Sequence, residues 1–134
     1  MVKPVNLPRN LPPMQLGYPR TDLRRRLVDA VQSGKKTATA GLCADYETEG
    51  EPLPKVGDRF LLLDYDDEPV AVVEATEVRV LRVADVDLAF ARDEGEGFES
   101  VEEWRAAHEM FWAGHEIADD SLVVAERFRV VANL

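Results

Sequence analysis

The chain has little cysteine, since its 134 residues include only Cys43. A single thiol cannot form an internal disulfide, so a disulfide-stapled secreted scaffold is excluded and a reducing cytoplasm is the expected compartment. Long hydrophobic runs are also missing, because the longest, such as Phe60–Leu63 and Val70–Val73, have four residues. Such runs are too short for a membrane span or a signal segment, so we expect a cytoplasmic protein with no membrane partner.

Metal-binding side chains are scarce as well. The two histidines, His108 and His115, are seven positions apart, whereas a zinc-binding pair on one helix face needs a spacing of four. Cys43 has no second cysteine with which to share a metal. His108 is therefore interpreted as a packed helix residue beside Trp104 and Phe111, and we expect neither a metal nor another cofactor.

Positive charge is limited and unevenly distributed. Lys and Arg number 16 against 26 Asp and Glu, and the formal net charge of -10 argues against a protein that coats nucleic acid through bulk attraction. Residues 1–36 hold eight basic and two acidic residues, or +6, and the rest of the chain carries -16. This asymmetry allows a local anion-binding face for a small nucleotide ligand, with a solvated basic helix face as the alternative.

The length is typical of one domain with one hydrophobic core. Residues 1–19 form a proline-rich arm, which is expected to be extended or irregular because proline disfavours a helix. Residues 20–134 form the domain. The arm contains Pro4, Pro8, Pro12, Pro13 and Pro19.

The domain begins with a predicted amphipathic helix. Thr21 suits its N-cap and Gly34 its end. Leu23, Leu27 and Val31 recur on one side of this helix, with Arg24, Arg25 and Arg26 in outer positions. Further predicted elements are strands over 37–42, 58–64, 70–80 and 122–131, a loop over 45–55, and helices over 84–92 and 100–114. The second and third strands should form a hairpin, and the order favours an α+β fold with a small mixed or antiparallel sheet curled into a partial barrel.

The cluster from Gly34 to Thr39 places two amines and two hydroxyls at the junction of a helix and a strand. It lacks the glycines of a phosphate-binding P-loop. A partly buried lysine loses charge and can deprotonate a hydroxyl for attack on an acyl carbon, although solvated lysines are the alternative. Because residues three apart on a straight strand point to opposite faces, Lys36 and Thr39 converge only if the chain bends between them.

Several glutamates stand where they could enter a site. Glu74 and Glu126 each interrupt an apolar strand face, so they require a cationic partner or water, and structural ion pairing is as compatible with the pattern as a role in a site. Glu94 and Glu96 alternate with glycines that allow close approach of a ligand, or that merely end a helix.

An ordered set of motifs over residues 16–131 resembles the ASCH domain family. The motifs are Gly34–Thr39, Pro52–Asp58, Phe90–Gly97, Trp104 with Arg105 and His108, and Glu126–Phe128. The resemblance, to a longer branch that contains the sequence EGEG, implies a PUA-like fold, a small mixed β-barrel with flanking helices. It also implies RNA or a modified nucleoside as partner, since the superfamily includes RNA-binding modules, ribonucleases and amidohydrolases that deacetylate N(4)-acetylcytidine.

The amidohydrolases carry a G-x-K-x-x-T motif, which falls here on Gly34, Lys36 and Thr39, and a glutamate that Glu94 matches. The resemblance implies Lys36 as general base, Thr39 as nucleophile and Glu94 as the group that orients the lysine or shuttles its proton. Gly41 stands where the family has arginine, so the group that contacts an anion is either missing or supplied by another residue, such as Arg24 or Lys35. Residues expected to bind substrate are Lys35, Tyr46, Glu74, Glu126 and Arg24.

The leading hypothesis is a metal-independent amidohydrolase that deacylates N(4)-acetylcytidine-like substrates. A ribonuclease that uses the same cleft is the first alternative, with Lys36 stabilising the phosphorane. A non-catalytic module that binds RNA through the face from Arg20 to Lys36 is the second.

Overall fold

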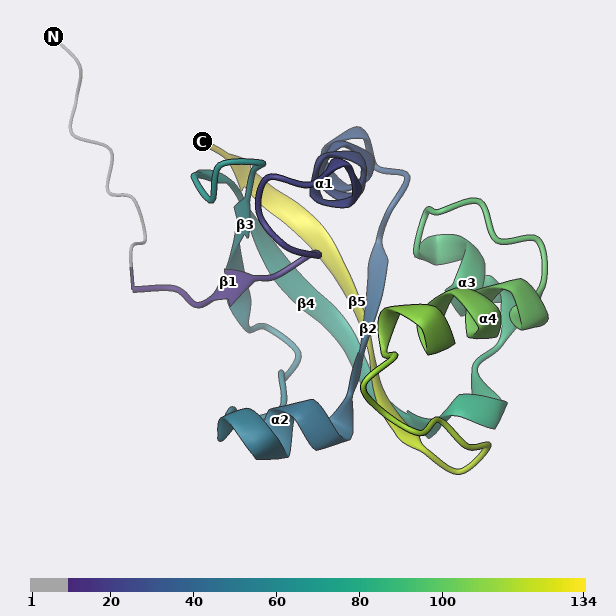
Figure 1. Cartoon of the computed structure of the whole chain (residues 1–134). Coiled ribbons are helices and arrows are strands. Elements are labelled where there is room, and N and C mark those ends of the chain that lie inside the picture. Colours follow the sequence, from purple (N-terminus) through teal and green to yellow (C-terminus); the bar gives the residue numbers. More distant parts are fainter. Residues whose placement is uncertain (1–9) are drawn as a thin grey trace, which may run out of the picture.

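A five-stranded sheet occupies the centre of the molecule, and helices pack against both of its faces (Figure 1). The computed structural model describes residues 10–134; residues 1–9, which belong to the predicted proline-rich arm, lie outside them. The strands are β1 (Pro13–Met14), β2 (Ala38–Leu42), β3 (Arg59–Leu63), β4 (Pro69–Arg82) and β5 (Leu122–Asn133), in the spatial order β1-β3-β4-β5-β2.

The pairing makes the sheet mixed and curled. β1 runs parallel to β3, whereas the other pairs are antiparallel and β3 with β4 forms the predicted hairpin. The long β4–β5 ladder contains two register irregularities, and such bulges increase the local twist of a sheet. The expected small mixed sheet curled into a partial barrel is confirmed.

Helix α1 (Asp22–Ser33) is confirmed with the predicted signals at both ends. The hydroxyl of Thr21 accepts the backbone N–H of Arg24 at 3.1 Å. Gly34 has a φ of 85°, a left-handed conformation that glycine adopts without side-chain strain, and its N–H donates to the carbonyl of Val31.

One position on α1 differs from the prediction. Arg24 was expected on the outer side of the helix, but its side chain is fully buried. Its guanidinium donates to the carbonyls of Leu16, Gly17 and Asp64 and to the carboxylate of Asp67. The residue therefore ties the segment before α1 to the turn between β3 and β4.

The remaining helices are α2 (Cys43–Glu49), α3 (Leu88–Asp93) and α4 (Val101–Phe111), with the short 3-10 turn η1 (Val83–Asp85) before α3. The two helices predicted over 84–92 and 100–114 are present in shorter form. The predicted loop over 45–55 was wrong in its first half, where α2 forms. No residue of α2 is buried, so this helix carries no apolar stripe that a sequence pattern could reveal. Among residues 10–134, no helix is long and apolar enough to span a bilayer.

Two hydrophobic cores lie on opposite faces of the sheet. The first packs α3 and α4 against β2 and β5 and contains Ala38, Leu42, Val83, Val86, Phe90, Ala91, Trp104, Trp112, Val123 and Ala125. The second packs α1 and the chain around β1 against the other face and contains Met14, Leu16, Leu27, Val28, Val31, Leu62, Ala71, Val73 and Phe128. In Figure 1, β2 passes between α1 on one side and α3 and α4 on the other.

Candidate functional site

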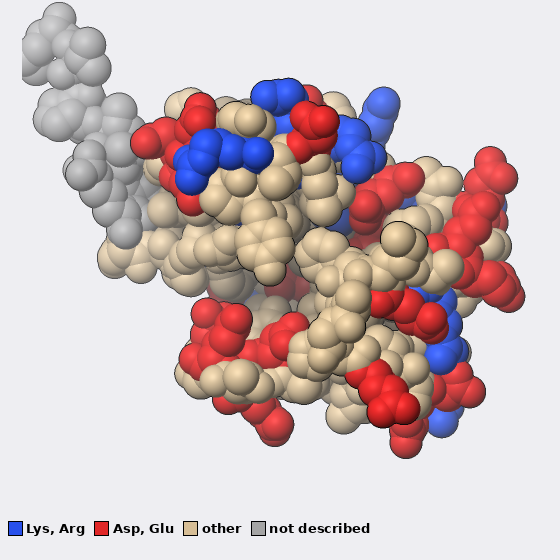
Figure 2. Space-filling model, in the orientation of Figure 1, with Lys and Arg blue, Asp and Glu red and all other residues tan. Residues whose placement is uncertain are grey.

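A cavity of about 500 Å³ lies between α1, the start of β2 and α4. The space-filling view is hollowed on the same face, with basic side chains gathered over α1 and acidic ones over α2 and around α4 (Figure 2). The polar side chains that line the cavity are Gln15, Arg26, Lys36, Thr39, Glu94, Glu96 and His108. The structure thus brings together the three residues that the sequence assigned to catalysis.

The chain bends between Lys36 and Thr39, as convergence requires. After the turn at Gly34, the N–H of Lys36 donates back to the carbonyl of Ala30 at 2.9 Å, so the backbone of Lys36 is held against the end of α1. Pairing of β2 with β5 begins only at Ala38. Lys36 therefore precedes the regular strand, and the alternation of side chains along β2 does not apply to it.

The amine of Lys36 is buried beside Glu94. The Lys36 side chain is 2% exposed, its Nζ donates to the Glu94 carbonyl at 3.2 Å, and Nζ lies 3.9 Å from Glu94 Oε1. Burial lowers the pKa of Lys36, while the charges of Glu94 and Glu96 oppose that shift. A lowered pKa favours the uncharged amine, which is the form of lysine that can accept a proton.

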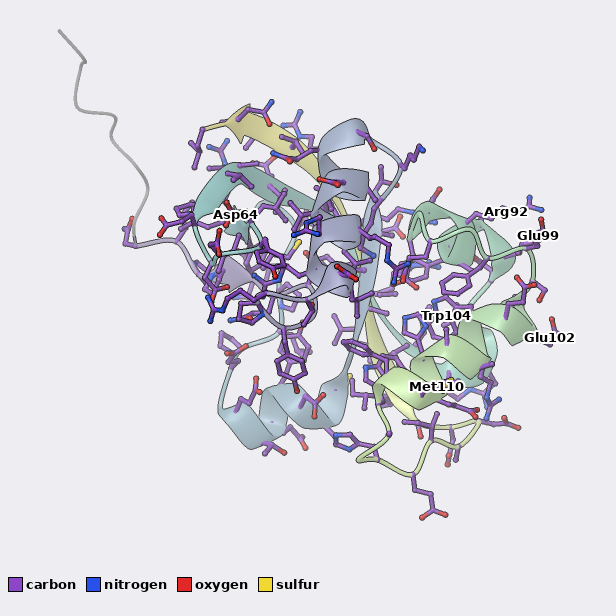
Figure 3. The ribbon with its side chains drawn as sticks, turned by 45° about the horizontal axis from the view of Figure 1, so that its top comes forward. Asp64, Arg92, Glu99, Glu102, Trp104 and Met110 are labelled. Atoms are coloured by element: carbon purple, nitrogen blue, oxygen red, sulfur yellow. The ribbon has the colours of Figure 1, made fainter. Side chains whose placement is uncertain are left out.

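Glu94 is held by α4. Its Oε2 accepts the indole N–H of Trp104 and lies 3.2 Å from Nε2 of His108. Figure 3 shows Trp104 on the side of α4 that faces the rest of the molecule, while Glu102 and Glu99 lie on the outer side. The interpretation of His108 as only a packed helix residue was incomplete, because His108 also contacts the carboxylate nearest to Lys36.

The loop after α3 is fixed against the chain that carries Lys36. The N–H of Thr37 donates to the carbonyl of Asp93 at 2.8 Å. Arg127 on β5 donates to the Asp93 carboxylate at 3.1 Å and lies over the ring of Phe90. These contacts set the position of Glu94, the next residue in the chain.

Glu96 and Arg26 bring opposite charges to the same cavity. Burial raises the pKa of Glu96, and the nearby charges of Lys36 and Arg26 act in the other direction. Arg26 was predicted only as an outer residue of α1 and had no role in the sequence-based site. Its contribution depends on how α1 packs across β2, which the helix pattern alone does not reveal.

Thr39 lies opposite Glu126 in the antiparallel β2–β5 ladder. Directly opposed residues project from the same face of a sheet, so the Glu126 side chain accompanies that of Thr39. Glu126 is 4% exposed, and its Oε2 has no hydrogen-bond partner among residues 10–134. Burial, aided by the charge of Asp58, raises the pKa of Glu126 to about 7.

Tyr46 on α2 covers Gly41. A Cβ atom at Gly41 would lie 3.3 Å from Cε2 of Tyr46, so the aromatic ring occupies the space that a longer side chain would need. Burial raises the pKa of Tyr46 to about 12, and the charge of Glu126 adds to the shift. Tyr46 therefore remains a neutral phenol beside Glu126, outside the lining of the cavity.

Other predicted binding residues also lie outside the cavity lining. The guanidinium of Arg24 makes the buried contacts described above, so it does not replace the arginine that the family has at the position of Gly41. Glu74 accepts hydrogen bonds from Arg59 and Arg129 on the neighbouring strands, and these bonds lower its pKa. Lys35 is exposed and does not line the cavity.

The rest of the lining is largely apolar. It consists of Leu16, Gly17, Leu23, Leu27, Ala40, Phe98, Ala107, Met110 and Phe111. Phe111 and Met110 at the end of α4 remain exposed. In the described part of the chain, no group of three or more His, Cys, Asp and Glu residues is placed to hold a metal ion.

The comparisons with known proteins agree with this architecture. The model of the ASCH domain family matches residues 15–132. Protein EF3133 from Enterococcus faecalis V583 is 30% identical, with a TM-score of 0.77 over 86% of this chain and 72% of that one. The ASCH domain from Lactobacillus crispatus JV V101 is 33% identical, with a TM-score of 0.70 over 79% and 70%.

A more distant structure shares the fold alone. The ASCH protein from Zymomonas mobilis is 16% identical, with a TM-score of 0.51 over 78% of this chain and 61% of that one. No curated protein matches the sequence. The PUA-like fold expected from the sequence is confirmed by the solved ASCH domain from Lactobacillus crispatus.

Proposed function

The chain belongs to the ASCH domain family, and we propose that it is an amidohydrolase that removes an acyl group from the exocyclic nitrogen of an N(4)-acetylcytidine-like substrate. The observation that carries this proposal is the buried amine of Lys36, which lies 3.9 Å from the Glu94 carboxylate on a cavity that Thr39 also lines. A base, its orienting acid and a hydroxyl are the groups that acyl transfer through a covalent intermediate requires.

Acyl transfer begins with the uncharged amine of Lys36. The Thr39 hydroxyl gives its proton to Nζ as Oγ1 bonds to the acyl carbon, and the tetrahedral intermediate then expels the cytosine nitrogen. That nitrogen takes the proton from Lys36 as the C–N bond breaks. The acyl group is left as an ester on Thr39.

Deacylation repeats the same proton transfers with water. Lys36 accepts a proton from the water that attacks the ester, and it returns the proton to Thr39 Oγ1 as the acid leaves. Glu94 keeps the amine in place through its backbone carbonyl and its carboxylate. The atoms balance with one amide and one water consumed and one amine and one carboxylic acid released.

The chemistry of the cavity supports a nucleoside or an unpaired nucleotide rather than a long duplex. Phe98 and Phe111 offer apolar faces to a base, and Arg26 is the cation on the α1 side. The formal net charge of -10 and the acidic surface around α2 and α4 repel an extended phosphate backbone (Figure 2).

The test measures release of acetate from N(4)-acetylcytidine, as the free nucleoside and within a single-stranded RNA. Lys36→Ala should abolish turnover, whereas Lys35→Ala removes the same side chain from the exposed neighbour and should retain it. Thr39→Val should also be inactive, and rapid quenching of Thr39→Ser should trap one acetyl group on the protein by mass spectrometry. Equal release by the wild type and Lys36→Ala would remove Lys36 from the mechanism.

The same reactions separate the alternative activities. Shortened RNA without acetate release, again dependent on Lys36, would identify a ribonuclease. Binding of RNA that falls steeply with salt, with no product of either kind, would identify a binding module.

A further inference from the structure

β2 is an edge strand of the sheet. It pairs with β5 on one side and, within residues 10–134, with no strand on the other. An edge strand presents a row of backbone N–H and C=O groups that no neighbouring strand occupies. Which residues of β2 carry these open groups follows from the hydrogen-bond pattern of the β2–β5 ladder.

One bond at the start of the ladder fixes that pattern. The N–H of Phe128 donates to the carbonyl of Thr37 at 3.0 Å, and the β2–β5 register, extended by one pair, places these two residues opposite each other. Opposed pairs of an antiparallel ladder alternate between hydrogen-bonded and non-hydrogen-bonded. The pair that contains Thr39 is therefore hydrogen-bonded, and the pair that contains Ala40 is not. The N–H of Ala40 points away from β5, and no loop carbonyl of the described residues accepts it.

The cavity passes around this open edge. Thr39 and Ala40 are consecutive, so their side chains project from opposite faces of the sheet, yet both residues line the cavity. The rest of the lining also comes from both faces, because Leu27 belongs to α1 and Ala107 to α4. These two helices lie on opposite sides of β2 (Figure 1). The cavity therefore meets the edge of β2 where the N–H of Ala40 emerges.

The position of Ala40 distinguishes it from the other residues with open-edge groups. The alternation assigns such groups to Ala38, Ala40 and Leu42. Of these three, Ala40 alone lines the cavity, whereas Ala38 and Leu42 are buried in the core formed with α3 and α4. Ala40 also follows Thr39 directly in the chain, so its N–H is held beside the Thr39 hydroxyl. A backbone N–H next to a nucleophile is the kind of donor that stabilises the oxyanion of acyl transfer.

We infer that the backbone N–H of Ala40 binds the acyl oxygen of the substrate and stabilises the negative charge that develops there when Thr39 attacks. The inference rests on the proposed function, within which it supplies the oxyanion donor. As Oγ1 of Thr39 bonds to the acyl carbon, one electron pair of the C=O bond moves to the acyl oxygen. That pair returns when the bond to the cytosine nitrogen breaks. The same N–H acts again when water attacks the ester, and it keeps its proton throughout.

Replacing Ala40 by lactic acid in the full chain tests this role. The change puts an ester oxygen in place of the N–H and leaves the methyl side chain as it is. The kcat of acetate release from N(4)-acetylcytidine should fall by about a hundredfold or more with KM close to that of the wild type, because the donor acts on charge that develops in the transition state. Ala40→Pro lacks the same N–H, is tolerated by an edge strand, and should show the same loss. A lactic acid variant within about twofold of the wild-type kcat would overturn the inference.

Replacing Leu42 by leucic acid is the matched control. It also removes an open-edge N–H, and it also converts a carbonyl that accepts from β5 into the weaker carbonyl of an ester. Leu42 does not line the cavity, so this variant should keep the wild-type kcat. Equal losses in the two ester variants would assign the effect to the strand as a whole and would overturn the inference.

Amide hydrogen exchange tests the geometry without substrate. The N–H groups of Thr39 and Gly41 are held in the β2–β5 ladder, so the N–H of Ala40 between them should exchange faster than either. An Ala40 amide protected as strongly as its two neighbours would show that it is already hydrogen-bonded, and the inference would be overturned.

Failure of the inference and failure of the proposed function give different results. A wild type that releases no acetate would overturn the proposed function, and the role of the Ala40 N–H with it. A wild type that releases acetate no faster than the lactic acid variant, or that protects the Ala40 amide, would overturn the inference alone.

Discussion

Gly95 lies directly against the backbone of Lys36. A Cβ atom at Gly95 would be 2.7 Å from Lys36 Cα, and the glycine has a φ of 73°. Only glycine permits this approach without displacing a backbone segment. The contact holds Glu94, the residue before Gly95, next to Lys36.

Gly95→Ala should therefore damage the site as well as the fold. The clash and the left-handed backbone together should cost about 3 kcal/mol of unfolding free energy, and acetate release should fall with the displacement of Glu94. Urea denaturation and turnover measure the two effects. Gly97→Ala is the matched control, because Gly97 has a φ of 84° but, among the described residues, no atom lies within 4 Å of its added Cβ. It should lose about 1 kcal/mol and keep its activity; equal effects of both substitutions would contradict the prediction.

Arg24 should be a stability residue with no direct role in turnover. Arg24→Leu leaves three backbone carbonyls and Asp67 without their donor, which should cost about 3 kcal/mol in urea denaturation. Arg25→Leu is the control on the next residue of α1. Arg25 lies over the ring of Tyr65 and 3.5 Å from Asp22 on the surface, so its loss should cost less than about 1 kcal/mol. A smaller cost for Arg24 than for Arg25 would refute this assignment.

Local signals explain which elements were predictable from the sequence. α1 was predicted with both of its ends because Thr21 and Gly34 act through contacts within one helical turn. The hairpin of β3 and β4 follows from a polar turn between two apolar strands. α2 was missed because none of its residues is buried, so hydrophobic periodicity carries no information about it.

The candidate site was predictable only in part, for a similar reason. Lys36, Thr39 and Glu94 follow from motifs that resemble a known family, and all three line one cavity. Arg26 belongs to no such motif, and the motif that contains His108 assigned it no role in the site. The positions of both side chains depend on the packing of α1 and α4 across the sheet. The exposure of Arg24 was predicted wrongly because the sequence does not distinguish three consecutive arginines on a helix. In the structure, the carbonyl groups of Leu16 and Asp64 accept hydrogen bonds from Arg24 alone among the three.

The ring of Tyr46 should block an arginine at position 41. Gly41→Arg must displace the ring from its place over Gly41 and should cost about 2 kcal/mol in urea denaturation. Tyr46→Ala combined with Gly41→Arg should recover part of that loss, giving a coupling energy of about 1 kcal/mol in a double-mutant cycle. Gly114→Arg is the control, because no other described atom lies within 4 Å of a Cβ at Gly114. Strictly additive effects of the two substitutions would show that Tyr46 does not fill this space.

Glu126 should make the stability of the protein depend on pH. Its pKa in the folded chain is raised to about 7 from its usual 4.5, so between these values the folded state binds more protons than the unfolded state. The contribution of Glu126 to the free energy of unfolding is therefore complete below pH 4.5 and is lost as the pH rises through 7. At 1.36 kcal/mol per pKa unit, the loss is about 3 kcal/mol by pH 8.

Glu126→Gln imitates the protonated acid, so its unfolding free energy should match the wild type at pH 4.5 and exceed it at pH 8 by up to that amount. Urea denaturation at intervals between these pH values measures the difference. Glu74→Gln provides a control of opposite sign, because hydrogen bonds from Arg129 and Arg59 lower the pKa of Glu74, and this variant should lose stability relative to the wild type at pH 8. Parallel curves for the wild type and Glu126→Gln would mean that the Glu126 carboxyl has the same pKa in the folded and the unfolded chain, and the raised pKa of this buried acid would have to be abandoned.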